Sequence, residues 1–130
     1  MNFFPYLIVV NTEESINFYN KAFGFELIES AKTGSGEIEH AEMRLNDALI
    51  MFSTEGAYGT TAKAPVTYGV ESSLNLYIYC EDVDELFNRA SAAGCKILKN
   101  PENAFWGDRW AEFEDINGYK WSFATKIKTT

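Results

Sequence analysis

The amino-acid sequence predicts an α+β protein built from two copies of a βαβββ unit. A weak self-similarity at an offset of about 70 residues is the first observation behind this prediction. The second is the order of patterns inside each copy, where a strand-like apolar run precedes one helical period and three further strand-like runs. The third observation is the position of two glycines, because Gly24 and Gly94 follow the last residue of each helical period, where a helix commonly ends.

The first copy, module one, is expected to cover residues 1–53. Its helix should begin at Asn11 or Thr12, because both residue types are good N-caps, and should end before Gly24. The expected strands are 6–10, 26–32, 39–45 and 48–53. A tight turn at Asn46-Asp47 joins the last two.

The second copy, module two, is expected to cover residues 74–130 and to repeat this order. Asp82 and Glu85 have the spacing of a capping box at the start of a helix. The expected strands are 74–80, 96–98, 109–114 and 119–125, with Asn117-Gly118 as the last hairpin turn. Residues 54–73 are rich in Gly, Thr and Ala and are interpreted as a linker, long enough to act as a flap or a dimer contact.

Composition excludes several classes of partner. A net charge of −8 without any basic run argues against nucleic acid, because phosphate binding needs clustered Lys and Arg. No apolar stretch approaches the roughly 20 residues that span a bilayer, and no signal peptide is indicated, so a cytoplasmic protein is expected. Cys80 and Cys95 are interpreted as reduced core thiols.

Alternation along the strands indicates which side chains share a face. In the strand 74–80 the even-numbered residues are apolar and should meet the helix, which leaves Asn75, Tyr77 and Tyr79 on the other face. The same reasoning places His40 with Glu42, and Trp110 with Glu112, on faces turned away from the helices. Faces with aromatic and charged side chains are more typical of a ligand cavity than of a sandwich core.

Three segments together resemble a known family. They are SINFYNKAFGFEL, HAEMRLNDALIMF and FWGDRWAEFEDINGYKWSFAT, which are similar in order and spacing to A-x-x-F-Y-x-x-x-F-G, H-A-x-L-x-x-G and W-G-D-R…D-P-x-G-x-x-W. These phrases belong to the PhnB-like branch of the vicinal oxygen chelate superfamily, which includes glyoxalases and bleomycin-resistance proteins. The resemblance implies paired βαβββ modules forming a concave mixed sheet, commonly in a homodimer. Here the last turn is Asp115-Ile116-Asn117-Gly118, so Ile116 replaces the usual Pro but Gly118 remains.

Metal-using members of that superfamily hold a divalent ion with His, Gln or Glu at four positions. The resemblance carries these positions onto Phe4, Met51, Asn75 and Ser122. None of these side chains is a good ligand for a divalent ion that prefers imidazole and carboxylate. We therefore expect no metal of the usual kind and no other cofactor.

Three residues are candidates for acid–base chemistry: His40, Glu42 and Glu112. His40 is the sole histidine, and a neighbouring carboxylate could tune its charge for proton transfer. A histidine that only bonds a strand neighbour, or an atypical metal site formed by His40 with the glutamates, remains an alternative.

Six residues are candidates for ligand binding: Tyr6, Asn75, Tyr77, Trp106, Arg109 and Trp110. The tryptophans could stack on a flat or cationic molecule, although packing at a dimer interface is an equal alternative. Arg109 could clamp a carboxylate or a phosphate-like group, unless it forms a structural lock with Asp108.

Two functions fit these residues. The first, which we favour, is a metal-free module that binds a small organic molecule in an acidic, aromatic cavity. The second is a lyase or isomerase of the glyoxalase type, in which His40 and a glutamate transfer a proton next to a carbonyl group.

Overall fold

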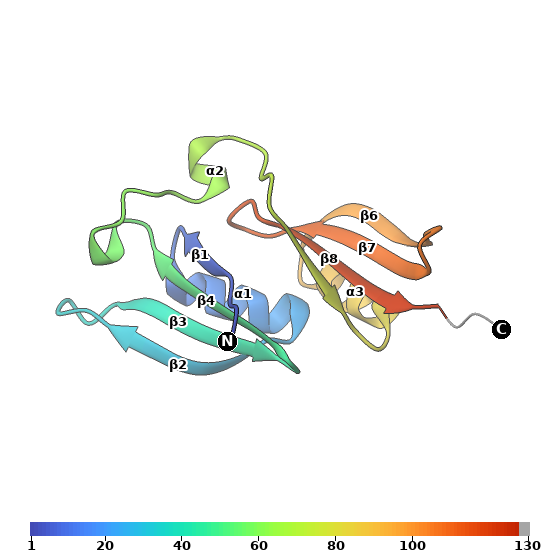
Figure 1. Cartoon of the computed structure of the whole chain (residues 1–130). Coiled ribbons are helices and arrows are strands. Elements are labelled where there is room, and N and C mark those ends of the chain that lie inside the picture. Colours follow the sequence, from blue (N-terminus) through green and yellow to red (C-terminus); the bar gives the residue numbers. More distant parts are fainter. Residues whose placement is uncertain (128–130) are drawn as a thin grey trace.

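The computed structural model describes residues 1–127 and contains the two expected βαβββ modules, joined by a segment with two short helices (Figure 1). Module one consists of β1 (Tyr6–Val9), α1 (Thr12–Phe23), β2 (Glu26–Lys32), β3 (Ile38–Leu45) and β4 (Ala48–Thr54). Module two consists of β5 (Asn75–Tyr79), α3 (Val83–Ala92), β6 (Lys96–Asn103), β7 (Asp108–Glu114) and β8 (Lys120–Lys126). The connecting segment holds η1 (Ala57–Gly59) and α2 (Pro65–Tyr68), which the sequence analysis did not predict.

The helix boundaries follow the capping residues. The Asn11 side chain accepts a hydrogen bond from the Glu14 amide, and Asp82 does the same for Glu85. Gly24 ends α1 in the left-handed conformation, with φ of 88°, which a residue without Cβ adopts freely. The predicted helix starts are therefore confirmed.

The strands form two mixed sheets of four strands each. The order is β1-β4-β3-β2 in module one and β5-β8-β7-β6 in module two. In each sheet the first strand pairs parallel with the last, and the other pairs are antiparallel. Within residues 1–127 no strand of one sheet pairs with a strand of the other, so the predicted single concave sheet is replaced by two separate ones.

A shared core holds the modules together. Each sheet packs one face against its own helix, and α1 also contacts α3. Fully buried aromatic side chains from both modules meet there: Tyr19 of α1 lies 5.4 Å from Trp121 of β8 between ring centroids, and Phe23 lies 4.9 Å from Phe123. The opposite face of each sheet, called here its open face, is not covered by a helix (Figure 1).

A buried carboxylate joins module two to α1. One Asp115 oxygen accepts from the Tyr19 hydroxyl at 2.6 Å and from the Trp121 indole at 2.8 Å. The other accepts from the backbone amides of Asn117 and Tyr119. We call residues 115–119 the inter-module turn, because it links the two modules through these bonds.

The inter-module turn also covers the free edge of β1. The Tyr119 hydroxyl bonds both the amide and the carbonyl of Ile8, at 3.2 and 2.8 Å, and the Asn117 side chain accepts from the Val10 amide. The Val66 amide of α2 donates in turn to the Asn117 carbonyl. At Ile8 and Val10 the edge of β1 is thus bonded by side chains of module two rather than by another strand.

No helix among the described residues is long and apolar enough to cross a membrane. Cys80 and Cys95 are free thiols, as predicted. Burial raises the pKa of Cys95 to about 12, so this thiol is protonated at neutral pH.

Candidate functional site

An aromatic cluster around a carboxylate stands on the open face of module two. One Asp108 oxygen accepts three hydrogen bonds, from the hydroxyls of Tyr77 at 2.6 Å and Tyr79 at 2.9 Å and from the Trp106 indole at 3.0 Å. Trp110 completes the cluster, since its ring lies 5.6 Å from that of Trp106. We call these five residues the Asp108 cluster.

Hydrogen bonding fixes the protonation states in the Asp108 cluster. The Tyr77 hydroxyl is the main cause that lowers the pKa of Asp108, with further help from Tyr79 and Trp106. Desolvation and the bond to Asp108 raise the pKa of Tyr77 to about 12. At neutral pH the carboxylate is therefore charged and the phenols are neutral donors.

The rings of the Asp108 cluster are available to a ligand. Tyr77, Tyr79 and Trp106 expose 40%, 52% and 49% of their surface although their hydroxyl or indole groups are bonded to Asp108. The arrangement keeps the polar ends together and leaves the apolar faces open. Such fixed, exposed rings suit a flat organic molecule, because little conformational entropy is lost when they stack.

Two lysines lie over these rings. The Lys126 ammonium lies 5.0 Å from the centre of the Tyr79 ring, and that of Lys99 lies 5.4 Å from the centre of Trp110. Both distances are within the range of cation–π attraction. The Trp110 indole nitrogen is buried and has no hydrogen-bond partner in the described structure, so it is a donor left for an acceptor that can reach it.

The open face of module one carries a different group. The Tyr6 hydroxyl lies 3.1 Å from Nδ1 of His40, and Nε2 of the same ring lies 3.9 Å from a Glu42 carboxylate oxygen. Tyr58, which has a positive φ of 55°, places its ring edge-on to His40 at 6.3 Å. His40 thus lies between a phenol and a carboxylate on one face, as the strand alternation predicts.

Glu112 and His40 are not brought together. Glu112 lies on β7 opposite Ser122 and Lys99, whereas His40 lies on β3 of the other sheet. The two sheets are separate, so among the three predicted acid–base residues only Glu42 lies beside His40, and Glu112 lies on the open face of module two.

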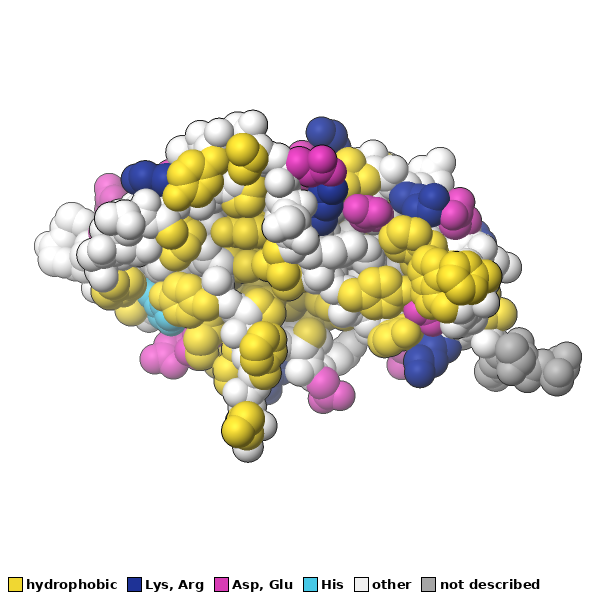
Figure 2. All heavy atoms as spheres, turned by 45° about the horizontal axis from the view of Figure 1, so that its top comes forward, with side chains coloured by type: hydrophobic (Ala, Val, Ile, Leu, Met, Phe, Trp, Pro, Cys, Tyr) yellow, Lys and Arg dark blue, Asp and Glu magenta, His cyan; other side chains and the backbone are white. Residues whose placement is uncertain are grey.

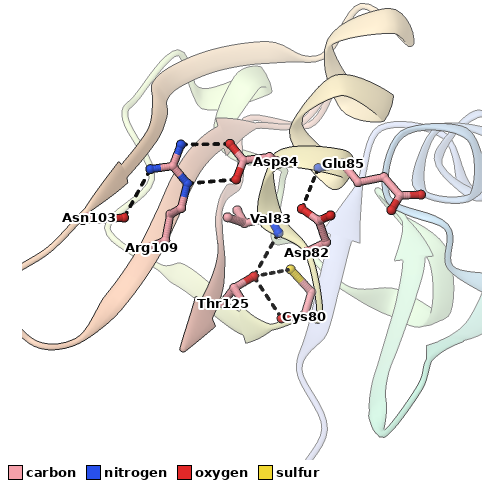
Figure 3. Close-up of polar contacts among 8 residues, drawn as sticks. All are labelled: Cys80, Asp82, Val83, Asp84, Glu85, Asn103, Arg109 and Thr125. Atoms are coloured by element: carbon pink, nitrogen blue, oxygen red, sulfur yellow. Dashed lines mark hydrogen bonds and ion pairs between the residues drawn. The ribbon is translucent and has the colours of Figure 1, made fainter. Parts of the chain in front are cut away.

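Arg109 is a predicted binding residue that the structure places away from both open faces (Figure 3). It points to the helix side of β7, where its guanidinium forms two bonds to Asp84 at 2.8 and 2.9 Å and one to Asn103 at 3.2 Å. The cause is strand alternation, since Arg109 has the parity of the buried Ala111. Arg109 therefore fastens β7 to the start of α3, and it bonds neither the open face nor Asp108.

The positions that the resemblance assigns to metal ligands do not fit a metal. Asn75 and Ser122 bond each other at 3.1 Å, and Phe4 and Met51 offer an aromatic ring and a thioether. Among residues 1–127 no three His, Cys, Asp or Glu side chains gather as a metal site would require, and none joins His40 and Glu42 as a third ligand.

Sequence reasoning missed the centre of the cluster. Asp108 was considered only as a partner of Arg109, because the strand was expected to begin at residue 109 rather than 108. Its parity with Trp110, two residues later, is the signal that places it on the open face. Lys99 and Tyr58 carried no such signal, because β6 was expected to end at residue 98 and residue 58 to lie in a linker.

Comparison with known proteins agrees with the fold and shows the family. The pattern of the Glyoxalase/Bleomycin resistance protein/Dioxygenase superfamily matches residues 4–123. The chain belongs to this superfamily. Among curated relatives it is similar to the uncharacterized protein Mb0911c of Mycobacterium bovis, with 28% identity over 95% of this chain and 82% of that protein.

Solved structures share the fold at lower identity. TioX from Micromonospora sp. ML1 is 24% identical with a TM-score of 0.79, and the match covers 98% of this chain and 99% of TioX. TnmS3, an antibiotic binding protein from Streptomyces sp. CB03234, is 19% identical with a TM-score of 0.64 over 97% of both chains. At these identities the matches establish the βαβββ architecture alone.

Proposed function

We propose that this protein binds a small organic molecule on the open face of module two, without a metal. The observation that carries the proposal is the Asp108 cluster, where three donors converge on one carboxylate oxygen and leave the aromatic faces exposed. Binding through stacking needs no cofactor, which agrees with the poor ligands at positions 4, 51, 75 and 122. TnmS3, with the same fold, is an antibiotic binding protein, which supports this class of function.

The charge distribution favours a neutral or cationic ligand. The protein has a net charge of −8, and the Asp108 carboxylate and Glu112 lie on the same face as the rings. The negative faces of the aromatic rings attract cations, as Lys99 and Lys126 already show. An organic ammonium group would compete with these lysines for the same faces.

We also propose a homodimer in the cytoplasm and a place in the PhnB-like branch. The exposed aromatic side chains on both open faces support an interface between copies, and two free thiols fit a reducing compartment. The phrases HAEMRLND and WGDRW support the branch.

The experiment that tests binding is a screen of small aromatic amines and neutral aromatic compounds by thermal shift, in the presence and absence of EDTA. A ligand that binds only the native state raises the melting temperature. EDTA should leave the thermal shift unchanged. Trp110→Ala should reduce the affinity for the ligand about tenfold or more, because stacking of a flat ring, such as a nucleobase, on one aromatic side chain contributes about 1–3 kcal/mol. A shift that disappears with EDTA, or persists fully in Trp110→Ala, contradicts the proposal.

A second candidate function is favoured by one observation, the Tyr6–His40–Glu42 arrangement. The imidazole has the Tyr6 hydroxyl at Nδ1 and the Glu42 carboxylate near Nε2, so it can pass a proton to or from a substrate on the open face of module one. This arrangement would serve a lyase or isomerase that transfers a proton next to a carbonyl group. His40→Ala should abolish turnover of such a substrate while the melting temperature is retained; full turnover in this variant removes the candidate.

A further inference from the structure

The two modules differ at the free edge of their first strand. β1 and β5 are equivalent, since Tyr6 pairs with Met51 as Tyr77 pairs with Ser122. By the same registers Ile8 of β1 corresponds to Tyr79 of β5. Ile8 has its amide and carbonyl bonded to the Tyr119 hydroxyl.

At Tyr79 the corresponding bonds are missing. Cys80 donates its amide to Ala124 of β8, so the alternate residue Tyr79 turns its amide and carbonyl away from the sheet. Within residues 1–127 these two groups meet no protein partner on that side. An edge of this kind is a ready hydrogen-bonding template.

The missing partner can be identified from the repeat. Leu49 pairs with Arg44 as Lys120 pairs with Glu114, so Ala48 occupies in module one the position of Tyr119 in module two. An alanine methyl stands where a phenol stands in the other half. The structure therefore has one edge filled by a tyrosine and one edge with a space in its place.

The space is present as two adjoining pockets, of about 190 and 350 Å³. Both are lined by Asp47 and Ala48 from the hairpin and by Tyr77 and Ile78 from β5. Figure 2 shows hydrophobic side chains along the middle of the molecule, between its two halves. A cavity of about 150 Å³ is enough to hold benzene. A phenol therefore fits the larger of the two, which is also the one that Tyr79 lines.

We propose that the gap between the Asn46–Ala48 turn and β5 is a binding site for a small phenol. The phenol ring lies against Ala48 and Ile78, and its hydroxyl accepts from the Tyr79 amide and donates to the Tyr79 carbonyl, as the Tyr119 hydroxyl does at Ile8. The site is separate from the stacking surface of the proposed function, although β5 borders both.

The test uses 4-methylphenol, which is the side chain of the missing tyrosine. In amide-detected NMR titrations of the full chain, it should give saturable shifts centred on the Tyr79 and Ala48 amides. Toluene fits the same space but forms neither hydrogen bond, so its affinity should be lower by about tenfold or more. The absence of a saturable shift at these amides overturns the proposal.

Two variants make the result specific. Ala48→Tyr supplies the phenol from the chain itself, so it should abolish 4-methylphenol binding and raise the melting temperature. Tyr119→Ala opens the matching space beside Ile8. Added 4-methylphenol should restore part of the stability that this variant has lost. Undiminished binding in Ala48→Tyr overturns the proposal, even where Tyr119→Ala does not fold.

The remaining outcomes separate this site from others. Trp110→Ala should leave the shift at Tyr79 unchanged, because the Asp108 cluster does not line the gap except through β5. Shifts confined to residues 106–112 would place the phenol on the Asp108 cluster. This result would contradict the phenol site in the gap but not the proposed function. A dimer that dissociates in Ala48→Tyr, with no phenol effect on the wild type, shows that a second copy fills the gap and equally refutes it.

Discussion

The two modules have the same backbone plan but use their open faces differently. His40 and Trp110 occupy equivalent positions, because they pair with Ser53 and Ala124 in matching registers. In module one the position carries an imidazole between a phenol and a carboxylate, and in module two it carries a ring of the aromatic cluster. The difference shows that the two modules keep the same helix-facing core while their open faces carry different chemical groups.

The same contrast holds at the junction between modules. Module two contributes a buried carboxylate and a tyrosine hydroxyl that bond α1 and β1, whereas the equivalent turn of module one contributes only Asn46 and Asp47, which are exposed. One side of the junction is therefore held by hydrogen bonds, and the other side is open. Substitutions on the two sides should therefore change the free energy of unfolding by clearly different amounts.

The largest effect is expected for Asp115→Ala. Four donors lose their acceptor, among them the buried Tyr19 hydroxyl and the Trp121 indole, and leaving buried donors unpaired should cost about 3 kcal/mol or more. Urea denaturation measures this. The control is Asp47→Ala in the turn of module one, where a change within about 0.5 kcal/mol is expected. Equal losses in the two variants would erase the asymmetry.

A smaller effect distinguishes two glycines with the same φ of +90°. A Cβ at Gly118 would lie 2.9 Å from the Val66 amide nitrogen, whereas at Gly107 it would meet nothing within 4 Å. Gly107→Ala should cost about 1–2 kcal/mol from backbone strain alone, and Gly118→Ala about 1–3 kcal/mol more because α2 must move. If both variants unfold at the same urea concentration, α2 does not depend on the inter-module turn.

The smallest effect concerns pH. The lowered pKa of Asp108 means that its carboxylate stabilises the fold above its unfolded pKa of about 4, and that this contribution is lost as pH falls through the folded value. Tyr77→Phe removes the main cause of the lowered pKa, so less stability should be lost on acidification. Melting temperatures between pH 7 and pH 3 measure this, with Tyr58→Phe as a control outside the cluster. An identical acid profile in wild type and Tyr77→Phe contradicts the role of the tyrosine.

Local sequence signals predicted most of the fold. Asn11, Gly24 and Asp82 fixed the helix ends through backbone bonding that depends on a few neighbouring residues. Alternation placed His40 and Trp110 on open faces. These features depend on nearest-neighbour chemistry and are therefore visible in a single sequence.

Features that depend on the packing of distant segments were not predictable in the same way. The hydrogen bond between Tyr19 and Asp115 joins residues 96 positions apart, and no local sequence pattern indicates it. The contact between α1 and α3, which holds the two modules together, likewise joins segments that are far apart in the sequence. The sequence left a ligand clamp and a lock with Asp108 open for Arg109, and its actual partner, Asp84, lies 25 positions away on α3.

The central claim is that module two, and not module one, presents the ligand-binding face. The equivalent positions 110 and 40 allow a matched test, in which isothermal titration measures the affinity of the best aromatic ligand from the screen for Trp110→Ala and His40→Ala under identical, metal-free conditions. The account predicts a loss of about tenfold or more in Trp110→Ala and wild-type affinity in His40→Ala. Wild-type affinity in Trp110→Ala together with a loss in His40→Ala would place the ligand on module one and contradict the claim.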